Sequence, residues 1–391
     1  MSVVAARLQD PLTRRLGALR QRWAVTGQAR TSTYVLLFAT VGVLNIIGVV
    51  MVLSASSVAS LTNYGSAWYF FQRQVLWTAL GVVAFMVTAR IDYHAWRRWV
   101  LPLLVLSLAL LVLVLIPGIG IYVAGSRRWL GSGFLRFQPT ELAKLAVLLF
   151  SADVLTRRSR DVHDWRKVLR PVLLVFGVTA VLVLREPDMD STVVLALIVG
   201  TVLVVGGVRL KHLAVVGGAG TLLAAILAVA EPYRRARVLT FFHPWSDASN
   251  TGYQVSQSLI ALGSGGWTGV GLGAGRSKWL FLPNAHTDFI FAIIGEEVGL
   301  VGCLLVVGLF VAFGVLGTRI ALRAPDRFGM LLAAGVTVWV VGQAAINIGG
   351  VVGLLPVSGI PLPFVSFGGS ALVFTMAGAG LLGSVARRAV P

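Results

Sequence analysis

Residues 282–297, LPNAHTDFIFAIIGEE, set acidic side chains in a strongly apolar background. Asp288 stands directly before an apolar run, and His286 precedes it by two residues. A carboxylate at a boundary between water and an apolar medium keeps its charge, yet it is desolvated enough to accept a proton. The pattern therefore predicts a general base at Asp288, with His286 in the same site. The alternative is that Thr287 or Asp288 caps the first turn of the following helix.

Glu296 and Glu297 lie inside the same apolar run. On a continuous helix Glu296 lies about 12 Å beyond Asp288 and about 80° around the axis, whereas Glu297 points nearly opposite to Asp288. We therefore expect the two glutamates to have different roles. Intramembrane carboxylates are costly and usually face the protein interior with a partner, so a structural ion pair is the leading interpretation of both.

A second charged group lies in RFQPTELAK, residues 136–144. Pro139 suits the first turn of a helix, and Glu141 then lies near the positive helix end. Lys144 follows three residues later on the same face, so we expect the two side chains to pair. Helix electrostatics explains Glu141. A lysine more than one turn inside a membrane, however, needs a ligand, a partner or a water path, which makes Lys144 a candidate binding residue.

The elements that must position these side chains follow from composition. The chain has 391 residues, of which 57% are hydrophobic and 12% charged, and its mean hydropathy is +0.85. A soluble protein of this length exposes far more charge, so the sequence predicts an all-α polytopic membrane protein. Ten spans are expected, at residues 33–55, 75–93, 99–118, 138–156, 168–185, 191–208, 211–230, 288–316, 328–350 and 366–386.

The formal charge of +18 does not indicate a nucleic-acid partner, because the basic residues stand in short loops between apolar runs. They cluster before the first span and in every second connection, at residues 90–98, 157–170, 209–211, 319–327 and 387–388. The positive-inside rule makes this side cytoplasmic, with both termini on it. The expected organisation is a basic tail at 1–32, a ten-span domain at 33–386 and a short cytoplasmic end at 387–391.

Basic residues on the opposite, outer side break this bias. They are Arg127, Arg128 and Arg136 before the fourth span, and Arg234, Arg235, Arg237, Arg276 and Lys278 in the outer loop 231–287. Solvated loop charge is the plain alternative, but cations there do not help topology, and the clusters favour an anionic ligand. We therefore expect Arg136, Arg234 and Lys278 to join Lys144 in binding one.

The outer loop 231–287 is too long for a simple connection. Val255, Leu259 and Leu262 recur at helical spacing, which predicts an amphipathic helix at the outer surface or on top of the bundle. The glycine-rich stretch after it lacks a P-loop ending and follows no strand, so nucleotide binding is not expected.

Three other outer features have plain interpretations. Trp129 suits an interfacial anchor. Asp188, Asp190 and Ser191 in REPDMDST suit a cap for the next helix. The proline-rich residues 353–372, GLLPVSGIPLPFVSFGGSAL, predict irregular backbone, with Ser366 capping the last span.

The chain resembles the SEDS proteins (shape, elongation, division and sporulation), and within them the FtsW branch more than the RodA branch. The resemblance rests on GSRRWLGSGFLRFQPTELAK, REPDMDST, PYRRARVLTFFHPWSD, GYQVSQSLIALGSGGWTGVGLG, LPNAHTDFIFAIIGEEVGLVG and GLLPVSGIPLPFVSFGGSAL, in this order. It implies a peptidoglycan glycosyltransferase that polymerises lipid II at the outer face of the bacterial cytoplasmic membrane. The implied place is the division septum, and the implied partners are a class B penicillin-binding protein and other division membrane proteins.

The resemblance also implies residue roles. The essential aspartate of the family falls on Asp288, and its important tryptophan, arginine and lysine fall on Trp129, Arg136 and Lys144. Asp190 departs from the family, which usually has glycine there. Asp288 would take a proton from the attacking sugar hydroxyl, and the anomeric carbon would be inverted.

Several alternatives remain open from the sequence. A lipid II flippase would place its polar site near the membrane midplane. A RodA-like elongation synthase would share the chemistry of a division synthase. A scaffold that recruits division proteins would need no base. No cofactor is predicted, because the five histidines show no metal-ligand spacing, and a divalent cation such as Mg²⁺ is left open. The single cysteine, Cys303, excludes an internal disulfide.

Overall fold

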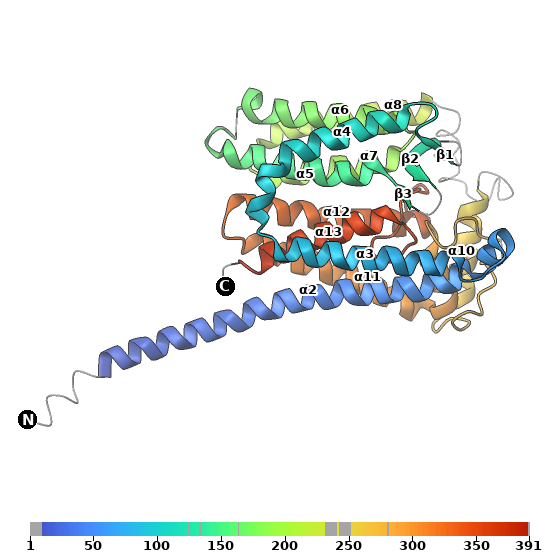
Figure 1. Ribbon diagram of the computed structural model, residues 1–391, viewed down its shortest axis with the longest axis horizontal. Helices are drawn as coiled ribbons and strands as arrows, with labels where there is room; N and C mark the ends of the chain where they lie inside the picture. Colours follow the sequence, from blue (N-terminus) through green and yellow to red (C-terminus); the bar gives the residue numbers. More distant parts are fainter. Residues whose placement is uncertain are drawn as a thin grey trace, which may run out of the picture.

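Long helices running side by side form most of the molecule (Figure 1). This computed structural model describes residues 10–123, 126–132, 135–162, 164–230, 241, 252–279 and 281–389. One helix stands at each of the ten predicted spans: α2 (Asp10–Tyr64), α3 (Tyr69–Arg90), α4 (Val100–Leu115), α5 (Pro139–Arg157), α6 (Arg170–Arg185), α7 (Met189–Val205), α8 (Leu210–Ala230), α11 (Ile290–Leu322), α12 (Arg327–Val351) and α13 (Ser370–Ala386). The all-α polytopic fold is thereby confirmed. Helix α2 begins well before the expected span.

Among the described residues, six helical stretches are long and apolar enough to cross a membrane. They lie within α2 and α3, across η1 (Tyr93–Trp99) with α4, across η3 (Trp165–Leu169) with α6, and in α11 and α12. Helices α7 and α13 are shorter apolar helices. Helix α5 carries Glu141, Lys144, Asp153 and Arg157, and it is buried along nearly its whole length. Such a charged helix belongs inside the bundle, away from lipid.

The connections gather at two opposite ends of the bundle (Figure 1). One end carries the α6–α7 turn, α10 (Tyr253–Gly265), segment 281–289 and the proline-rich segment 352–369; we call it the site end. The other end carries the C-terminus and the basic connections, including η2 (Ser159–Asp161). The loops that the charge pattern assigned to one side of the membrane therefore lie together at one end of the structure.

A small antiparallel sheet, which the sequence did not predict, lies at the site end in the connection before α5. Its strands are β1 (Ile121–Val123), β2 (Ser126–Ser132) and β3 (Leu135–Phe137), in the order β1-β2-β3. Trp129 stands opposite Ile121, and Arg136 stands opposite Gly131. Pairing satisfies backbone groups that would otherwise be unpaired close to an apolar medium. The strands are short, and two of them have three residues, so periodicity gives almost no signal for them.

The amphipathic helix expected in the outer loop is present as α10. Val255 is buried as predicted, but the buried face also includes Ser256, Ser258 and Ala261. Ser258 Oγ donates to the carbonyl of Val351 at 2.7 Å, which ties α10 to the end of α12. The helix therefore packs on the bundle through small polar residues as well as through its apolar stripe.

Candidate functional site

One face of α12 connects the two groups that the sequence singled out. Gln343 Oε1 accepts hydrogen bonds from Lys144 Nζ and from Trp339 Nε1, each at 3.2 Å. Gln343 Nε2 donates to the carbonyl of Pro361 at 2.9 Å. The buried amide thus joins α5, α12 and the proline-rich segment.

Asn347 repeats this arrangement one turn further along α12. Its Nδ2 donates to the carbonyl of Ile360 at 2.9 Å and to the backbone carbonyl of Asp288 at 2.8 Å. Residues four apart lie on the same helix face. Gln343 therefore holds Lys144, and Asn347 holds the backbone of Asp288, from adjacent turns of one helix.

Lys144 is fully buried, and its expected pairing with Glu141 is present. The distance from Lys144 Nζ to Glu141 Oε1 is 2.8 Å, and the ammonium group also lies 5.4 Å from the centre of the Trp339 ring. Within the described part of the chain Glu141 Oε2 has no hydrogen-bond partner. Since a buried charge needs a partner, Glu141 compensates the burial of Lys144 at this depth.

The segment carrying Asp288 is fastened through its backbone. Ser366 Oγ donates to the carbonyl of Thr287 at 2.5 Å and accepts from Leu362 N at 2.8 Å, and Phe367 N donates to the carbonyl of His286 at 3.0 Å. The expectation that Ser366 caps the last span is wrong, because α13 begins at Ser370. Ser366 instead joins two irregular segments.

Thr287 and Asp288 precede α11, which begins after Phe289, and the N-cap residue Phe289 makes no side-chain capping hydrogen bond. Thr287 Oγ1 donates to the carbonyl of Asn284 at 3.1 Å. Asp288 is partly exposed at the site end, with its backbone held by Asn347. Its carboxylate therefore lies where water and the protein interior meet.

His286 lies against aromatic rings. Its ring centre is 4.4 Å from that of Phe70 and 5.8 Å from that of Phe367. Burial lowers the pKa of His286 to about 4, because the charged imidazolium loses its hydration there. At neutral pH this side chain therefore supplies a neutral ring and no positive charge.

The α6–α7 turn holds a buried carboxyl, Glu186, that sequence patterns did not predict. Thr140 Oγ1 donates to Glu186 Oε2 at 3.2 Å, while Glu186 Oε1 has no partner within the described residues. Burial, with a smaller contribution from the nearby Asp188 carboxylate, raises the pKa of Glu186 to about 8. Glu186 is therefore mostly protonated at neutral pH. An acidic residue beside a proline at a predicted span end was the available signal.

The same turn fixes the sheet and the start of α7. Arg128 Nε donates to the carbonyl of Glu186 at 2.9 Å, which docks β2 on the turn. Asp188 caps α7 as predicted, since its Oδ1 accepts from Ser191 N at 3.1 Å. Asp190 Oδ2 accepts from Gly359 N at 2.8 Å and so reaches the proline-rich segment. A glycine in place of Asp190 would lack this link.

The remaining outer residues occupy different surroundings. Trp129 is half-buried on β2, and Arg136 is exposed on β3, two residues before Gln138, which leads into α5. Gln138 N donates to Ser370 Oγ at 3.0 Å, which fastens this strand end to α13. Arg234 lies outside the described residues.

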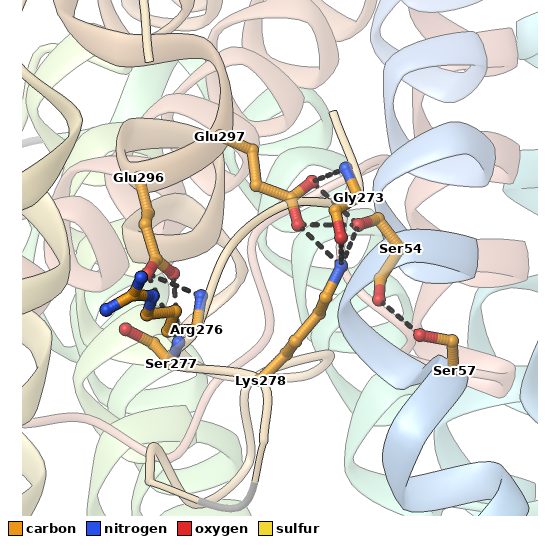
Figure 2. A network of polar contacts seen from close by, with 8 residues as sticks. All are labelled: Ser54, Ser57, Gly273, Arg276, Ser277, Lys278, Glu296 and Glu297. Atoms are coloured by element: carbon orange, nitrogen blue, oxygen red, sulfur yellow. Dashed lines mark hydrogen bonds and ion pairs between the residues drawn. The ribbon is translucent and has the colours of Figure 1, made fainter. Parts of the chain in front are cut away.

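Lys278 and the two glutamates form a separate network (Figure 2). Glu297 forms the expected ion pair, with Lys278 Nζ 2.9 Å from its Oε1. Glu296 instead accepts from Arg276 N at 2.8 Å and from Ser277 N at 3.2 Å. The expectation of different roles is wrong in one respect, because both carboxylates hold the same loop, residues 273–278. The helical extrapolation failed because Asp288 precedes α11 and the loop passes across both side chains.

Among the described residues, no group of three or more His, Cys, Asp or Glu side chains is arranged to hold a metal ion. The site end instead offers a partly exposed carboxylate at Asp288, a buried cation at Lys144 and an exposed cation at Arg136. A carboxylate in such a place suits proton transfer, and the cations suit an anionic leaving group.

Comparison with known proteins gives a consistent result. Residues 34–390 match the family model of the FtsW/RodA/SpoVE cell cycle proteins. The chain is 45% identical over 350 residues to the probable peptidoglycan glycosyltransferase FtsW of Thioalkalivibrio sulfidiphilus, a match that covers 88% of this chain and 87% of the relative. It is 39% identical over 361 residues to the stage V sporulation protein E of Bacillus subtilis, a match that covers 92% and 98%.

A solved structure is also similar. It comes from work on the structural coordination of polymerization and crosslinking by a peptidoglycan synthase complex. The match has a TM-score of 0.74 at 30% identity and covers 90% of this chain and 97% of the solved chain. The shared arrangement therefore includes nearly the whole described bundle.

Proposed function

The chain belongs to the FtsW/RodA/SpoVE family of cell cycle proteins, and from this premise we propose that it is a peptidoglycan glycosyltransferase. It polymerises lipid II into glycan strands for cell division. The reaction takes place at the site end, which faces outward from the bacterial cytoplasmic membrane, while both termini lie in the cytoplasm.

One observation carries the proposed mechanism: α12 holds Lys144 through Gln343 and the backbone of Asp288 through Asn347. A transferase acting on a lipid diphosphate needs a cation for the leaving group and a base for the attacking hydroxyl, at a fixed separation. A single helix face that fastens both supplies this separation.

In the proposed step, the Asp288 carboxylate takes the proton of the attacking sugar hydroxyl. The hydroxyl oxygen forms a bond to the anomeric carbon of a second lipid-linked sugar, and the bond from that carbon to the diphosphate oxygen breaks. The electron pair leaves with the lipid diphosphate, which Arg136 and Lys144 stabilise by charge. Direct displacement inverts the anomeric carbon, and no second carboxylic acid is needed because diphosphate leaves readily.

Trp129, Arg234 and His286 complete the proposed substrate site. Trp129 and His286 supply half-buried aromatic surface at the site end, and Arg234 adds charge in the outer loop. The proposed partners are a class B penicillin-binding protein and other division membrane proteins at the septum. A transpeptidase partner is supported by the similar solved structure, because that structure concerns a peptidoglycan synthase complex that coordinates polymerization and crosslinking.

The test uses purified full-length protein and lipid II, with glycan strands separated by length. Asp288→Asn keeps size and polarity but removes the base, so polymer should disappear while thermal stability stays near that of the parent protein. Asp161→Asn, which alters an exposed acid at the opposite end, is the matched control and should polymerise normally. Retained polymerisation by folded Asp288→Asn would remove Asp288 as the base.

The flippase alternative is separated in vesicles that contain labelled lipid II. Polymer formation on one face, without net transfer of label between leaflets, supports a synthase. Transfer of label without polymer would overturn the proposal.

A further inference from the structure

Helix α11 is interrupted inside its membrane-length run, and a neighbouring loop fills the interruption. Gly299 has φ of 75° and ψ of −167°, which is not helical. The carbonyls of Glu296 and Glu297 accept from Val270 N at 2.9 Å and Gly271 N at 3.1 Å. Beyond the break, Leu300 N donates to the carbonyl of Gly266 at 2.9 Å. Backbone groups freed by the break are thus satisfied by the segment 266–271.

The residues that follow this segment lie on the two glutamate side chains. A Cβ added at Gly275 would lie 2.9 Å from Glu296 Oε2 and 3.0 Å from Glu297 Oε1, so the loop fits closely over both. Gly273 N donates to Glu297 Oε2 at 3.0 Å. The loop is therefore shaped to these carboxylates.

Lys278 closes the arrangement against α2. Its Nζ donates to Glu297 Oε1 at 2.9 Å, to Ser54 Oγ at 3.1 Å and to the carbonyl of Gly273 at 2.6 Å. These contacts use all three donors of an ammonium group. Lys278 is 6% exposed and Glu297 is 1% exposed. A phosphate oxygen would have to displace one of these three partners to reach Lys278, whereas Lys144 has two partners, Glu141 and Gln343.

Ser54 completes the network from the other side. Its hydroxyl lies 2.7 Å and 2.6 Å from the two oxygens of Glu297 (Figure 2). Three elements that are distant in sequence, α2, the loop and α11, thereby meet at one buried ion pair.

Short backbone hydrogen bonds lie on both sides of residue 280, between this ion pair and Asp288. Trp279 N donates to the carbonyl of Arg276 at 3.0 Å, and Leu282 N donates to the carbonyl of Ser277 at 2.9 Å. Phe289 N then donates to the carbonyl of Asn284 at 3.3 Å. Lys278 and Asp288 therefore each lie within a hydrogen-bonded turn of the same stretch of chain.

We propose that Ser54, Lys278 and Glu297 form a latch that positions the Asp288 segment, and that Lys278 is a positioning residue without contact to substrate. This inference rests on the proposed role of Asp288 as the base. Removing either charge leaves the other buried without its partner, and Lys278 and the loop end that carries it then lose their fixed position against Glu297 and Ser54.

Steady-state polymerisation of lipid II by purified full-length variants tests the latch. Lys278→Met and Glu297→Gln should each lower kcat by about tenfold or more, because small displacements of a reacting group are costly, while KM changes by less than about twofold. The double variant Lys278→Met/Glu297→Gln should be no slower than the slower single variant, since one interaction is lost only once. Ser54→Ala should lower kcat less than either.

Matched controls come from the exposed pair Lys167 and Asp161 at the opposite end, 3.1 Å apart. Lys167→Met and Asp161→Asn should leave kcat and KM unchanged. A Lys278→Met variant with raised KM and unchanged kcat would overturn the latch in favour of substrate contact. Multiplying effects in the double variant would also overturn it.

Hydrogen exchange gives a readout that does not depend on turnover. Amides in residues 281–289 should exchange faster in Lys278→Met, Glu297→Gln and Ser54→Ala, whereas unchanged exchange would overturn the latch. Ser54→Ala keeps both charges, so it serves if the charge variants do not fold. If Asp288→Asn retains activity, the proposed base fails, yet the exchange result still decides whether the latch orders this segment.

Discussion

At the scale of single residues, Lys144 shows how a charge is kept inside a helix bundle. It lies 2.8 Å from Glu141 and 3.2 Å from Gln343, with no exposed surface. Two opposite charges on one helix face offset the cost of burying each. The pair therefore contributes to folding as well as to the proposed reaction, and the two contributions can be separated.

Lys144→Met should abolish polymerisation and lower the free energy of unfolding by about 3–5 kcal/mol, because Glu141 is left buried without its cation. The double variant Lys144→Met/Glu141→Leu removes both charges and should regain most of the stability but none of the activity. Melting temperature in detergent and polymer yield measure the two effects. Recovery of activity in the double variant would contradict a role for Lys144 in the reaction.

Glu186 should make stability depend on pH. Its pKa is about 8 in the folded protein against 4.5 ordinarily, so between these values the folded state holds a proton that the unfolded state has lost. Stability is then fully present below about pH 4.5 and declines as the pH rises to about 8.

Glu186→Gln should remove this decline, because an amide keeps a hydrogen-bond acceptor for Thr140 and does not ionise. Melting temperatures of both proteins between about pH 5 and 9 provide the measurement. Parallel pH curves for the two proteins would show that Glu186 does not titrate in this range.

Sequence patterns predicted the position and pairing of Glu141 and Lys144, since helical spacing fixes which side chains share a face. They did not predict that Lys278 would be enclosed by Glu297 and Ser54, which are far apart in the sequence. They also missed Gln343 and Asn347. Amides on a buried helix have no periodic or charge signal, and their importance comes from the tertiary contacts they make.

At the scale of elements, α11 departs from helical geometry at Gly299. The departure lets the backbone on both sides of the break hydrogen-bond to the segment 266–271. A positive φ inside a helix is tolerated by glycine and costs other residues. A Cβ added at Gly299 would lie 2.5 Å from the carbonyl oxygen of Trp267 and would also overlap Gly269 N. Transporters place such breaks at ligand sites. Here the backbone at the break is instead hydrogen-bonded to the segment 266–271 of the same chain.

Gly299→Ala should therefore destabilise the fold by more than about 1 kcal/mol, because both the backbone and the space around it exclude a methyl group. Gly308 in the same helix has nothing within 4 Å of an added Cβ, so Gly308→Ala is the matched control. That control should be neutral or slightly stabilising. Equal melting temperatures for both variants would contradict the importance of the break.

Most elements could be predicted because each long apolar run has only one stable form inside a membrane. The ten helices at the expected spans followed from this rule, and the apolar stripe of α10 followed from helical spacing. The three-stranded sheet did not follow, since its strands are too short to show alternation, and its docking through Arg128 depends on the distant α6–α7 turn.

At the scale of the whole molecule, the bundle has a site end and a basic end. This polarity predicts which side each loop faces. Because Cys303 is the single cysteine in the sequence and is buried, it can be replaced and new cysteines introduced one at a time.

In a Cys303→Ala background, Ser66→Cys between α2 and α3 should react with an impermeant maleimide added outside intact cells. Ser159→Cys in η2 should react only after the membrane is opened. Both serines are exposed, so access depends on the side of the membrane alone. The reverse labelling pattern would contradict the assigned orientation.

The positions of Gln343 and Asn347 on adjacent turns of α12 have one more consequence. Four residues of α-helix measure about 6 Å along the axis. That length is set by backbone geometry and does not vary with the loops around it. Helix α12 thus fixes the distance between Gln343, which holds Lys144, and Asn347, which holds the backbone of Asp288. A change in the outer loops that leaves α12 intact should therefore leave the separation between the two anchoring residues unchanged.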